Sequence, residues 1–467
     1  MMRRTPLFLL AAALVGMAAI VRGEERDDDA WPQFVRDIKT SEVSGNLIYF
    51  QRHRERYRVD ERRFDSNLHH QSLQGNLEIS SPFFADTAGF ELGAFATTDL
   101  RNSASPDHEI SFFPWSDPWS ADWSKKDADS GASLYRAHLK LRRKHENGAW
   151  WGKLGYFQPS GPGVMGVNWS LMPGSYLGAE GGIEQGALSL ASAYAARYKA
   201  PWYRKTYAFR EEDAANTKIS HIWSVGARYA FAPEASAEVA YGEAPGFLQS
   251  AHLKLKYRQE KSAGVKSPLY LSYQLYVMGD RDDAAFSGQS NNHYAGRWAF
   301  QHYAAFAREF SPYVLKGEFL HTRAPGTRDT HLGYFVYRLT GRYGGANGAY
   351  EPWWDNRSDW NHNRESAIFV SLSRALDDIG AAGVTATLSA ARGWGGKAYG
   401  VRQTLKENAW SLDLTWIVPS GTLKNTRVTL HYTHYDNKTR LPSWTGYKNL
   451  FQDERDLKFF VIVPWKL

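Results

Sequence analysis

One pattern recurs along most of this chain: apolar and polar side chains alternate over stretches of about ten residues. Residues 409–418 show it clearly. The apolar positions of that stretch are Trp410, Leu412, Leu414, Trp416 and Val418, and its polar positions are Ser411, Asp413 and Thr415. Successive side chains of a strand point to opposite faces, so the pattern predicts β-strands with one apolar and one polar face.

The length of these stretches favours strands that cross a membrane. At a rise of about 3.3 Å per residue and a tilt near 40°, 9 to 13 residues span a hydrocarbon layer of roughly 25 Å. Aromatic residues lie at the ends of the apolar faces, as in the girdles of membrane barrels. Examples are Trp410, Trp416, Phe231 and Tyr257. A soluble β-sandwich is the alternative, but it explains neither the length nor the aromatic ends.

Counting the connections predicts the number of strands. Short turns are expected after about residues 80, 143, 184, 231, 259, 309, 375 and 419. Longer loops alternate with these turns and are expected near 100–130, 158–175, 200–217, 280–292, 324–363, 394–406 and 437–454. The connections near 59–67 and 243–249 are shorter, but each stands where the alternation calls for a long loop. The expected fold is an all-β transmembrane antiparallel β-barrel of about 18 strands. Residues 332–339 would add an odd strand, so we assign them to the 324–363 loop.

The start of the chain predicts export. Arg3 and Arg4 precede an apolar run over residues 7–21, which is shorter than a membrane-spanning helix. We therefore expect a signal peptide at 1–23, a periplasmic segment at 24–44 and the barrel at 45–467. The absence of Cys excludes disulfides and thiolate metal sites. These features predict a bacterial outer-membrane location, with lipid, lipopolysaccharide and the outer-membrane insertion machinery as partners.

Charged side chains form rows on the polar faces of some strands. The basic rows are Arg52, Arg54 and Arg56; Arg136, Lys140 and Arg142; and Lys254, Lys256 and Arg258. Such rows on a lumen wall orient polar solutes. The alternative is a solvated wall without a preferred substrate. The positive charge of the rows could be balanced by acidic lumen positions, which are Glu78, Glu238, Glu318 and Asp413. The total charge, 56 basic against 49 acidic residues, is too even to indicate a nucleic-acid partner.

The loops carry the remaining signals. Residues 158–175 are rich in Gly and Pro and contain Met165, Val167, Trp169 and Met172, which favours a loop folded into the lumen over a surface loop. Tryptophans in the predicted loops suit stacking on sugar rings, or equally packing against lipopolysaccharide. His69, His70, His431 and His434 lack the spacing of a metal site, and no catalytic motif is present. We therefore predict no catalytic residues, no metal and no cofactor.

Several long strings resemble the OprD-type outer-membrane porin family, and within it the enterobacterial chitoporins. They are WSLMPGSYLGAEGG at 169–182, YKAPW at 198–202, EPWWDNRSDWN at 351–361, and YDNKTRLPSW with FQDERDLKFFVIVPW near the end. The resemblance covers nearly all of the mature chain. The chain ends in Trp465, Lys466 and Leu467, where the family tends to end in Phe, and its basic rows are richer in arginine than a neutral sugar requires.

The resemblance implies an 18-stranded barrel narrowed by its third loop and by a later long loop. By position, the constriction and substrate path would contain Trp169, Met172, Tyr176, Trp353, Trp354, Asp355, Arg357 and Asp359. It also implies a monomer or a loose trimer. The implied function is passive, substrate-selective uptake of small polar solutes, foremost chito-oligosaccharides. The alternatives are an OprD-like channel for basic amino acids or carboxylates, and an outer-membrane hydrolase or adhesin.

Overall fold

The computed structural model describes most of the chain. It covers residues 40–58, 62–102, 130–167, 171–201, 203, 205–211, 217–262, 264–281, 294, 298–325, 333–340, 348–356, 358–397, 404–439 and 452–467. The expected signal peptide and most of the expected periplasmic segment lie outside these residues. The first strand begins at Glu42.

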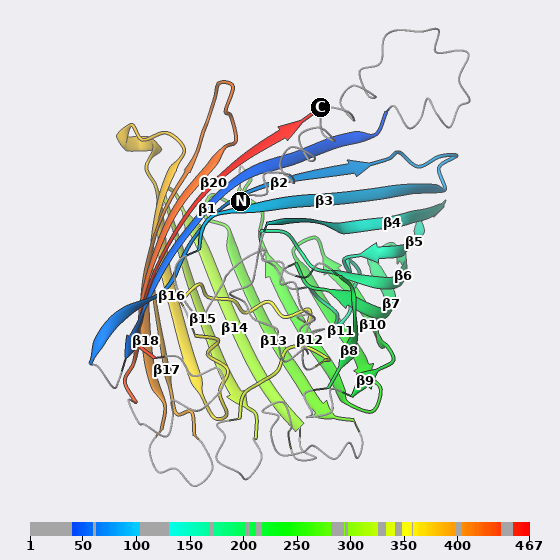
Figure 1. Cartoon of the computed structure of the whole chain (residues 1–467). Coiled ribbons are helices and arrows are strands. Elements are labelled where there is room, and N and C mark those ends of the chain that lie inside the picture. Colours follow the sequence, from blue (N-terminus) through cyan, green and yellow to red (C-terminus); the bar gives the residue numbers. More distant parts are fainter. Residues whose placement is uncertain are drawn as a thin grey trace.

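Eighteen antiparallel strands form a closed barrel within the described residues (Figure 1). They are β1 (Glu42–Arg58), β2 (Arg63–Ser80), β3 (Ala88–Asn102), β4 (Gly131–His145), β5 (Gly148–Phe157), β6 (Ser175–Gln185), β7 (Leu188–Lys199), β10 (Ile222–Ala232), β11 (Ala235–Ala244), β12 (Leu248–Arg258), β13 (Leu269–Asp280), β14 (Trp298–Phe310), β15 (Tyr313–Arg323), β16 (Ser366–Ala375), β17 (Val384–Trp394), β18 (Lys406–Ile417), β19 (Arg427–Asn437) and β20 (Glu454–Lys466). The last strand pairs with the first and closes the cylinder. The predicted architecture is confirmed.

Two further short strands stand outside the barrel order. β8 (Tyr207–Arg210) pairs with the end of β7, and β9 (Lys218–Ile219) pairs with β8. β7 itself continues the barrel by pairing with β10. The short ribbon therefore belongs to the connection expected near 200–217 and adds no wall strand.

Turns and long connections fall on opposite ends of the barrel, as the alternation predicts. Two connections at the long-loop end, 59–62 and 245–247, are as short as turns, and each keeps its place in the alternation. Residues 333–340 form no strand, and Tyr334 makes a single isolated bridge to His362. Their assignment to the long loop between β15 and β16 is therefore correct.

The exposure of the strands separates an outer apolar face from an inner polar face. Leu388 and Leu412, paired across β17 and β18, are 58% and 48% exposed, whereas Ser389 and Ser411 beside them are buried. Trp410, Trp416 and Phe231 are also exposed on the outside, as a girdle requires. The apolar residues that are buried lie inside the barrel, between its wall and the segments that fold inward.

Helical structure is minor in the described part of the chain. It is limited to one 3-10 turn, Asp377–Ile379, at the turn between β16 and β17. No described helix is long and apolar enough to cross a membrane.

The two faces of β17 give a direct test of the fold. Leu388→Arg places a charge on the outer surface at mid-strand, and we expect it to lower the free energy of unfolding by roughly 2–4 kcal/mol. Thr387→Arg is the matched control, because Thr387 lies on the inner face opposite Asp413 and its charge stays in water. Denaturant unfolding in lipid vesicles measures both. Equal losses for the two variants would contradict the assignment of the faces.

Candidate functional site

The connection between β5 and β6 folds into the barrel and lies on its inner wall. The carboxylate of Glu180, a buried inward residue of β6, accepts hydrogen bonds from the backbone N–H groups of Ser160 and Gly161 at 2.9 and 2.8 Å. The backbone N–H of Val164 donates to the hydroxyl of Ser224 on β10 at 2.8 Å. The predicted inward course of this loop is confirmed.

Small residues on both sides permit this close approach. A Cβ at Gly226 of β10 would lie 2.5 Å from the backbone carbonyl of Pro162, and a Cβ at Gly161 would lie 2.3 Å from the Cβ of Ala191. Both distances are shorter than van der Waals contact, so a larger residue at either position would push the loop away from the wall. The glycines of this region therefore set how far the loop narrows the lumen.

A second inward segment, residues 348–365, continues the first across the lumen (yellow, before β16 in Figure 1). The backbone N–H of Ala349 donates to the carbonyl of Val164 at 2.9 Å, and Met165 forms a β-bridge with Gly348. Farther along, the segment contacts side chains of β12, β15, β18, β19 and β20. The two segments together form one band inside the barrel.

Two carboxylates fix the second segment to basic residues of the wall. Glu351 lies 2.9 Å from Lys254 Nζ and 2.7 Å from Lys256 Nζ, both on β12. Burial alone would raise the pKa of Glu351, but the two ammonium groups outweigh it and hold the pKa below its usual range. Four residues later, Asp355 pairs with Lys458 of β20 on the opposite side.

The surroundings of Asp355 act on it in the same way. Burial works to raise the pKa of Asp355, but Lys458 and His431 outweigh burial and lower the pKa. The Asp355 backbone carbonyl also accepts a hydrogen bond from Thr433 Oγ1 at 3.0 Å. Both anchoring carboxylates therefore stay ionised at neutral pH, and they hold the segment at two points four residues apart.

Aromatic packing anchors the middle of the second segment. The indole of Trp354 stacks on Phe369 of β16 with ring centroids 5.3 Å apart, and its Nε1–H donates to Glu318 at 2.6 Å. Trp360 packs on both Trp354 and Tyr435. Trp354 and Trp360 are buried by these contacts, so their main role is to position the segment.

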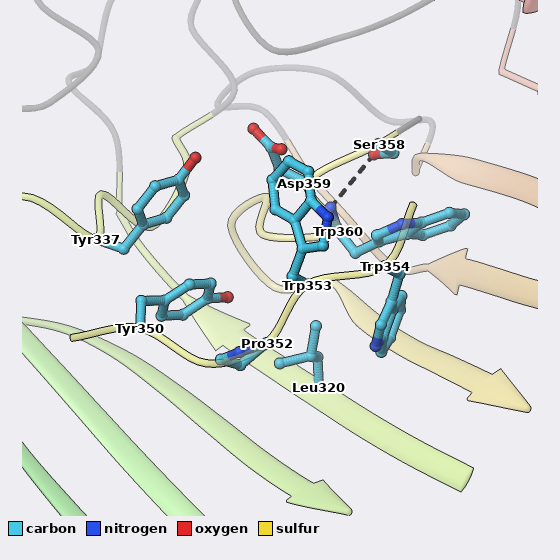
Figure 2. Close-up of a pocket in the computed structure, with 9 residues that line it drawn as sticks. All are labelled: Leu320, Tyr337, Tyr350, Pro352, Trp353, Trp354, Ser358, Asp359 and Trp360. Carbon is cyan, nitrogen blue, oxygen red and sulfur yellow. Dashed lines mark hydrogen bonds between the residues drawn. The ribbon is translucent and has the colours of Figure 1, made fainter. Parts of the chain in front are cut away.

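A hollow remains on the lumen side of this anchored segment (Figure 2). It opens to solvent, and the roughly 290 Å³ of empty space between its lining residues includes part of that open solvent. The lining residues are Leu320, Tyr337, Tyr350, Pro352, Trp353, Trp354, Ser358, Asp359 and Trp360. Trp353 rises in its centre and is 69% exposed, although the segment that carries it lies inside the barrel. A large indole surface is thus presented to the water of the lumen.

The residues expected in the constriction fall into three groups. Trp353, Asp355 and Asp359 are exposed or half-buried within the inward band. Met172, Tyr176 and Trp354 are buried in the packing of the band, and their place in the constriction or substrate path stays a prediction. Tyr176, for example, donates its hydroxyl to the carbonyl of Gly166. Trp169 and Arg357 lie outside the described residues.

The basic rows face inward and lie against carboxylates. Arg52 Nε is 2.9 Å from Asp456 and Arg56 Nε is 2.6 Å from Glu454, both on β20. Arg54 lies between these two and is buried. The wall on this side therefore has its positive charge balanced locally.

The other two rows are arranged in the same way. On β4, Arg136 is 3.3 Å from Glu91, Lys140 donates to Ser80 at 2.8 Å, and Arg142 is 3.1 Å from Asp86. On β12, Arg258 stands over the ring of Tyr270 at 6.0 Å. The positive charge of these rows is offset by partners in the wall, and their role toward a passing solute stays a prediction.

Sequence reasoning missed several residues that shape this site. The acidic partners Glu454 and Asp456 alternate on the last strand, and barrel closure places that strand beside Arg52 and Arg56. Reading the first and last strands as neighbours would have found them. Glu351 and the buried group His362, Glu365 and Glu407 were also missed, because they come together only once the long loop folds inward.

The anchor at Glu351 predicts how the band responds to acid. Glu351→Gln removes both ion pairs, so its single-channel current at neutral pH should fluctuate more than that of the unaltered protein. In the unaltered protein, the current should fluctuate in this way only below the usual carboxyl pKa of about 4. The folded protein holds the pKa of Glu351 below that value, so the ion pairs are lost only when acid protonates Glu351.

Planar-bilayer recordings between about pH 3 and pH 7 measure this effect. Glu309→Gln is the control, because Glu309 pairs with Lys261 near the turns, away from the band. A quiet Glu351→Gln channel at neutral pH would contradict the anchoring role.

Comparisons with known proteins agree with this architecture. The family described as "OprD: outer membrane porin, OprD family" matches residues 32–455. The chain is 33% identical over 484 positions to the chitoporin of Escherichia coli (strain K12), covering 100% of this chain and 98% of that protein.

Solved structures share the fold. OccAB1 of Acinetobacter baumannii aligns with a TM-score of 0.70 and 16% identity over 92% of this chain and 98% of its own. OpdK of Pseudomonas aeruginosa aligns with a TM-score of 0.68 and 14% identity over 92% and 100%. From the inward band, the closed barrel and the family match, we conclude that this chain belongs to the OprD family of outer-membrane porins.

Proposed function

We propose that this porin takes up chito-oligosaccharides by passive diffusion through the lumen. The single observation that carries the proposal is the exposed indole of Trp353 inside the barrel. Water-exposed indole surface is unfavourable unless a partner covers it. The apolar face of a pyranose ring is a partner of the right shape, and a passing sugar would cover the ring only briefly.

The polar groups around Trp353 suit the rim of such a sugar. Asp359 and Ser358 line the same hollow, and the phenol rings of Tyr337 and Tyr350 stand on one side of it (Figure 2). Hydroxyl and acetamido groups both donate and accept hydrogen bonds, so they can bind carboxylate and phenol oxygens. An aromatic platform with a polar rim is the usual form of a selective site for polar ligands.

The charge of the wall favours a neutral solute over an anion. Seven of the nine arginines and lysines of the three rows lie beside carboxylates of neighbouring strands or of the inward band. Paired charges leave a weak net field, which attracts a free carboxylate poorly but offers many hydrogen-bonding groups to hydroxyls. The similarity to a protein described as chitoporin supports the same class of substrate.

The competing function is a channel for basic amino acids or carboxylates. The observation in its favour is that Arg228 and Lys316 keep more than two fifths of their side-chain surface exposed on the inner wall. A hydrolase or adhesin role receives less support, because the family is one of channels. We also propose that residues 1–23 are removed on export and that the pore is a monomer or a loose trimer.

Replacing the exposed ring tests the sugar path. Trp353→Ala should weaken block of the ionic current by chitohexaose about tenfold, since an aromatic contact contributes about 1–1.5 kcal/mol. Trp410→Ala is the matched control, because that indole is exposed on the outer face and should leave the block unchanged. Titration of single-channel block in planar bilayers gives both constants. Identical block by the unaltered protein and Trp353→Ala would remove the aromatic path.

The choice of substrate can be tested with the unaltered protein. Chitohexaose added to one chamber should interrupt the current, whereas arginine and benzoate at the same concentration should leave it open. Interruption by arginine or benzoate alone would favour the competing channel. A reconstituted protein without conductance would instead favour the hydrolase or adhesin.

A further inference from the structure

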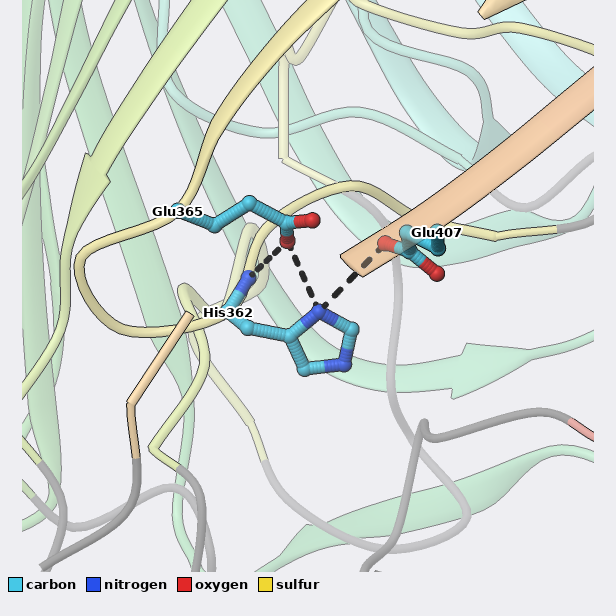
Figure 3. Close-up of side chains that lie close together, drawn as sticks. All are labelled: His362, Glu365 and Glu407. Atoms are coloured by element: carbon cyan, nitrogen blue, oxygen red, sulfur yellow. Dashed lines mark hydrogen bonds and ion pairs between the residues drawn. The ribbon is translucent and has the colours of Figure 1, made fainter. Parts of the chain in front are cut away.

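A buried group of one histidine and two carboxylates lies where the inward segment meets β18 (Figure 3). His362 and Glu365 belong to the segment and Glu407 to the strand. His362 Nδ1 is 2.8 Å from Glu365 Oε2 and 3.8 Å from Glu407 Oε1, and all three side chains have no exposed surface. One ligand atom from each lies within 4.8 Å of the other two. None of these three side chains lines the hollow around Trp353, and the proposed sugar path does not use them.

The group contains two buried carboxyl groups and one imidazole. Among the described residues, His362 is the only ion-pairing partner of Glu365 and Glu407. The other buried histidine–carboxylate pair of the wall, His252 with Glu238, differs in this respect. Glu238 also has Arg228 at 2.6 Å and Lys254 at 3.9 Å. No lysine or arginine of the described residues supplies a positive charge to Glu365 or Glu407, so the site can accept a cation between these two buried carboxyl groups.

One oxygen of this group has no hydrogen-bond partner. Glu365 Oε2 accepts from the backbone N–H of His362 at 3.0 Å, while Oε1 is buried and unsatisfied. Figure 3 shows the two carboxylates facing one another beside the imidazole. Gly393 of β17 leaves the room that Oε1 needs, because a Cβ there would lie 2.3 Å from it. An unsatisfied oxygen in a fully buried group points to a ligand that completes the group.

We propose that His362, Glu365 and Glu407 bind a divalent transition-metal ion, with zinc the best match. One imidazole nitrogen and two carboxylate oxygens form a donor set that zinc accepts at about 2.0–2.2 Å. Calcium and magnesium prefer oxygen ligands alone, so the imidazole selects against them. On binding, the metal replaces the proton on Nδ1 and supplies a positive charge to the two carboxyl groups.

Neighbouring hydroxyls already orient one of the ligands. Ser358 Oγ donates to Glu407 Oε1 at 3.0 Å, and the Tyr435 hydroxyl donates to Glu407 Oε2. Such outer hydrogen bonds are typical of metal-binding carboxylates. Because two ligands lie on the inward segment and one on the wall, a bound ion would join the band to the barrel. Binding to the folded state alone would raise the thermal stability.

The test is zinc content and thermal unfolding of the full-length protein in detergent. The protein is stripped with a chelator, dialysed against dilute zinc chloride and washed, and its metal is then measured by mass spectrometry. We expect about one zinc per chain and a higher unfolding temperature with zinc than with chelator. Excess calcium or magnesium should not displace the zinc. Glu365→Gln and His362→Asn should both lose it.

Glu238→Gln is the matched control. Glu238 is also a buried carboxylate beside a histidine, but it already pairs with Arg228, so this variant should keep the zinc. Zinc retained in Glu365→Gln and His362→Asn would place the ion on surface histidines and overturn the proposal. Unaltered protein that binds no zinc would overturn it as well. If the variants fail to fold, X-ray absorption of the zinc-loaded unaltered protein decides. One imidazole with oxygen ligands supports the site, and two or more imidazoles refute it.

Discussion

Every backbone N–H and C=O group that faces hydrocarbon must be hydrogen-bonded within the protein, and this requirement governs the rest of the structure. A sheet satisfies it only when its edges meet, which here is the pairing of β1 with β20 over thirteen residue pairs. Closure with eighteen strands leaves a lumen too wide for wall side chains to fill. The apolar side chains face outward because that side of the wall contacts lipid. The wide interior holds the polar side chains and the loops that fold inward.

The interior is organised by charge pairs between the wall and the inward band. Lys254 and Lys256 hold the second segment at Glu351, and Lys458 holds it at Asp355. Between these two points, stacking of Trp354 on Phe369 fixes the depth of the segment. These three lysines therefore hold the inward band in place, while Trp353 remains exposed.

The wall was predictable from sequence because its rule is local: a period of two places Leu412 outside and Ser411 inside without knowledge of any partner. The inward course of residues 158–174 was also predictable, from Gly, Pro and apolar residues in one loop. The orientation of single loop residues was not. Trp353 and Trp354 are adjacent and identical, and only the stacking partner Phe369, the acceptor Glu318 and the course of the segment decide which ring is exposed. The pairing of Glu351 with β12 depends on a contact almost one hundred residues away.

The seam between the first and last strands has a consequence for the biosynthesis of this protein. Arg52 and Asp456 are 404 positions apart in sequence yet share two hydrogen bonds across that seam. A chain released early from the ribosome would lack the last strands of the barrel. It would also lack Glu454 and Asp456, the acidic partners of the arginines on β1. Such a fragment would expose an unpaired strand edge together with a row of arginines that lacks its acidic partners.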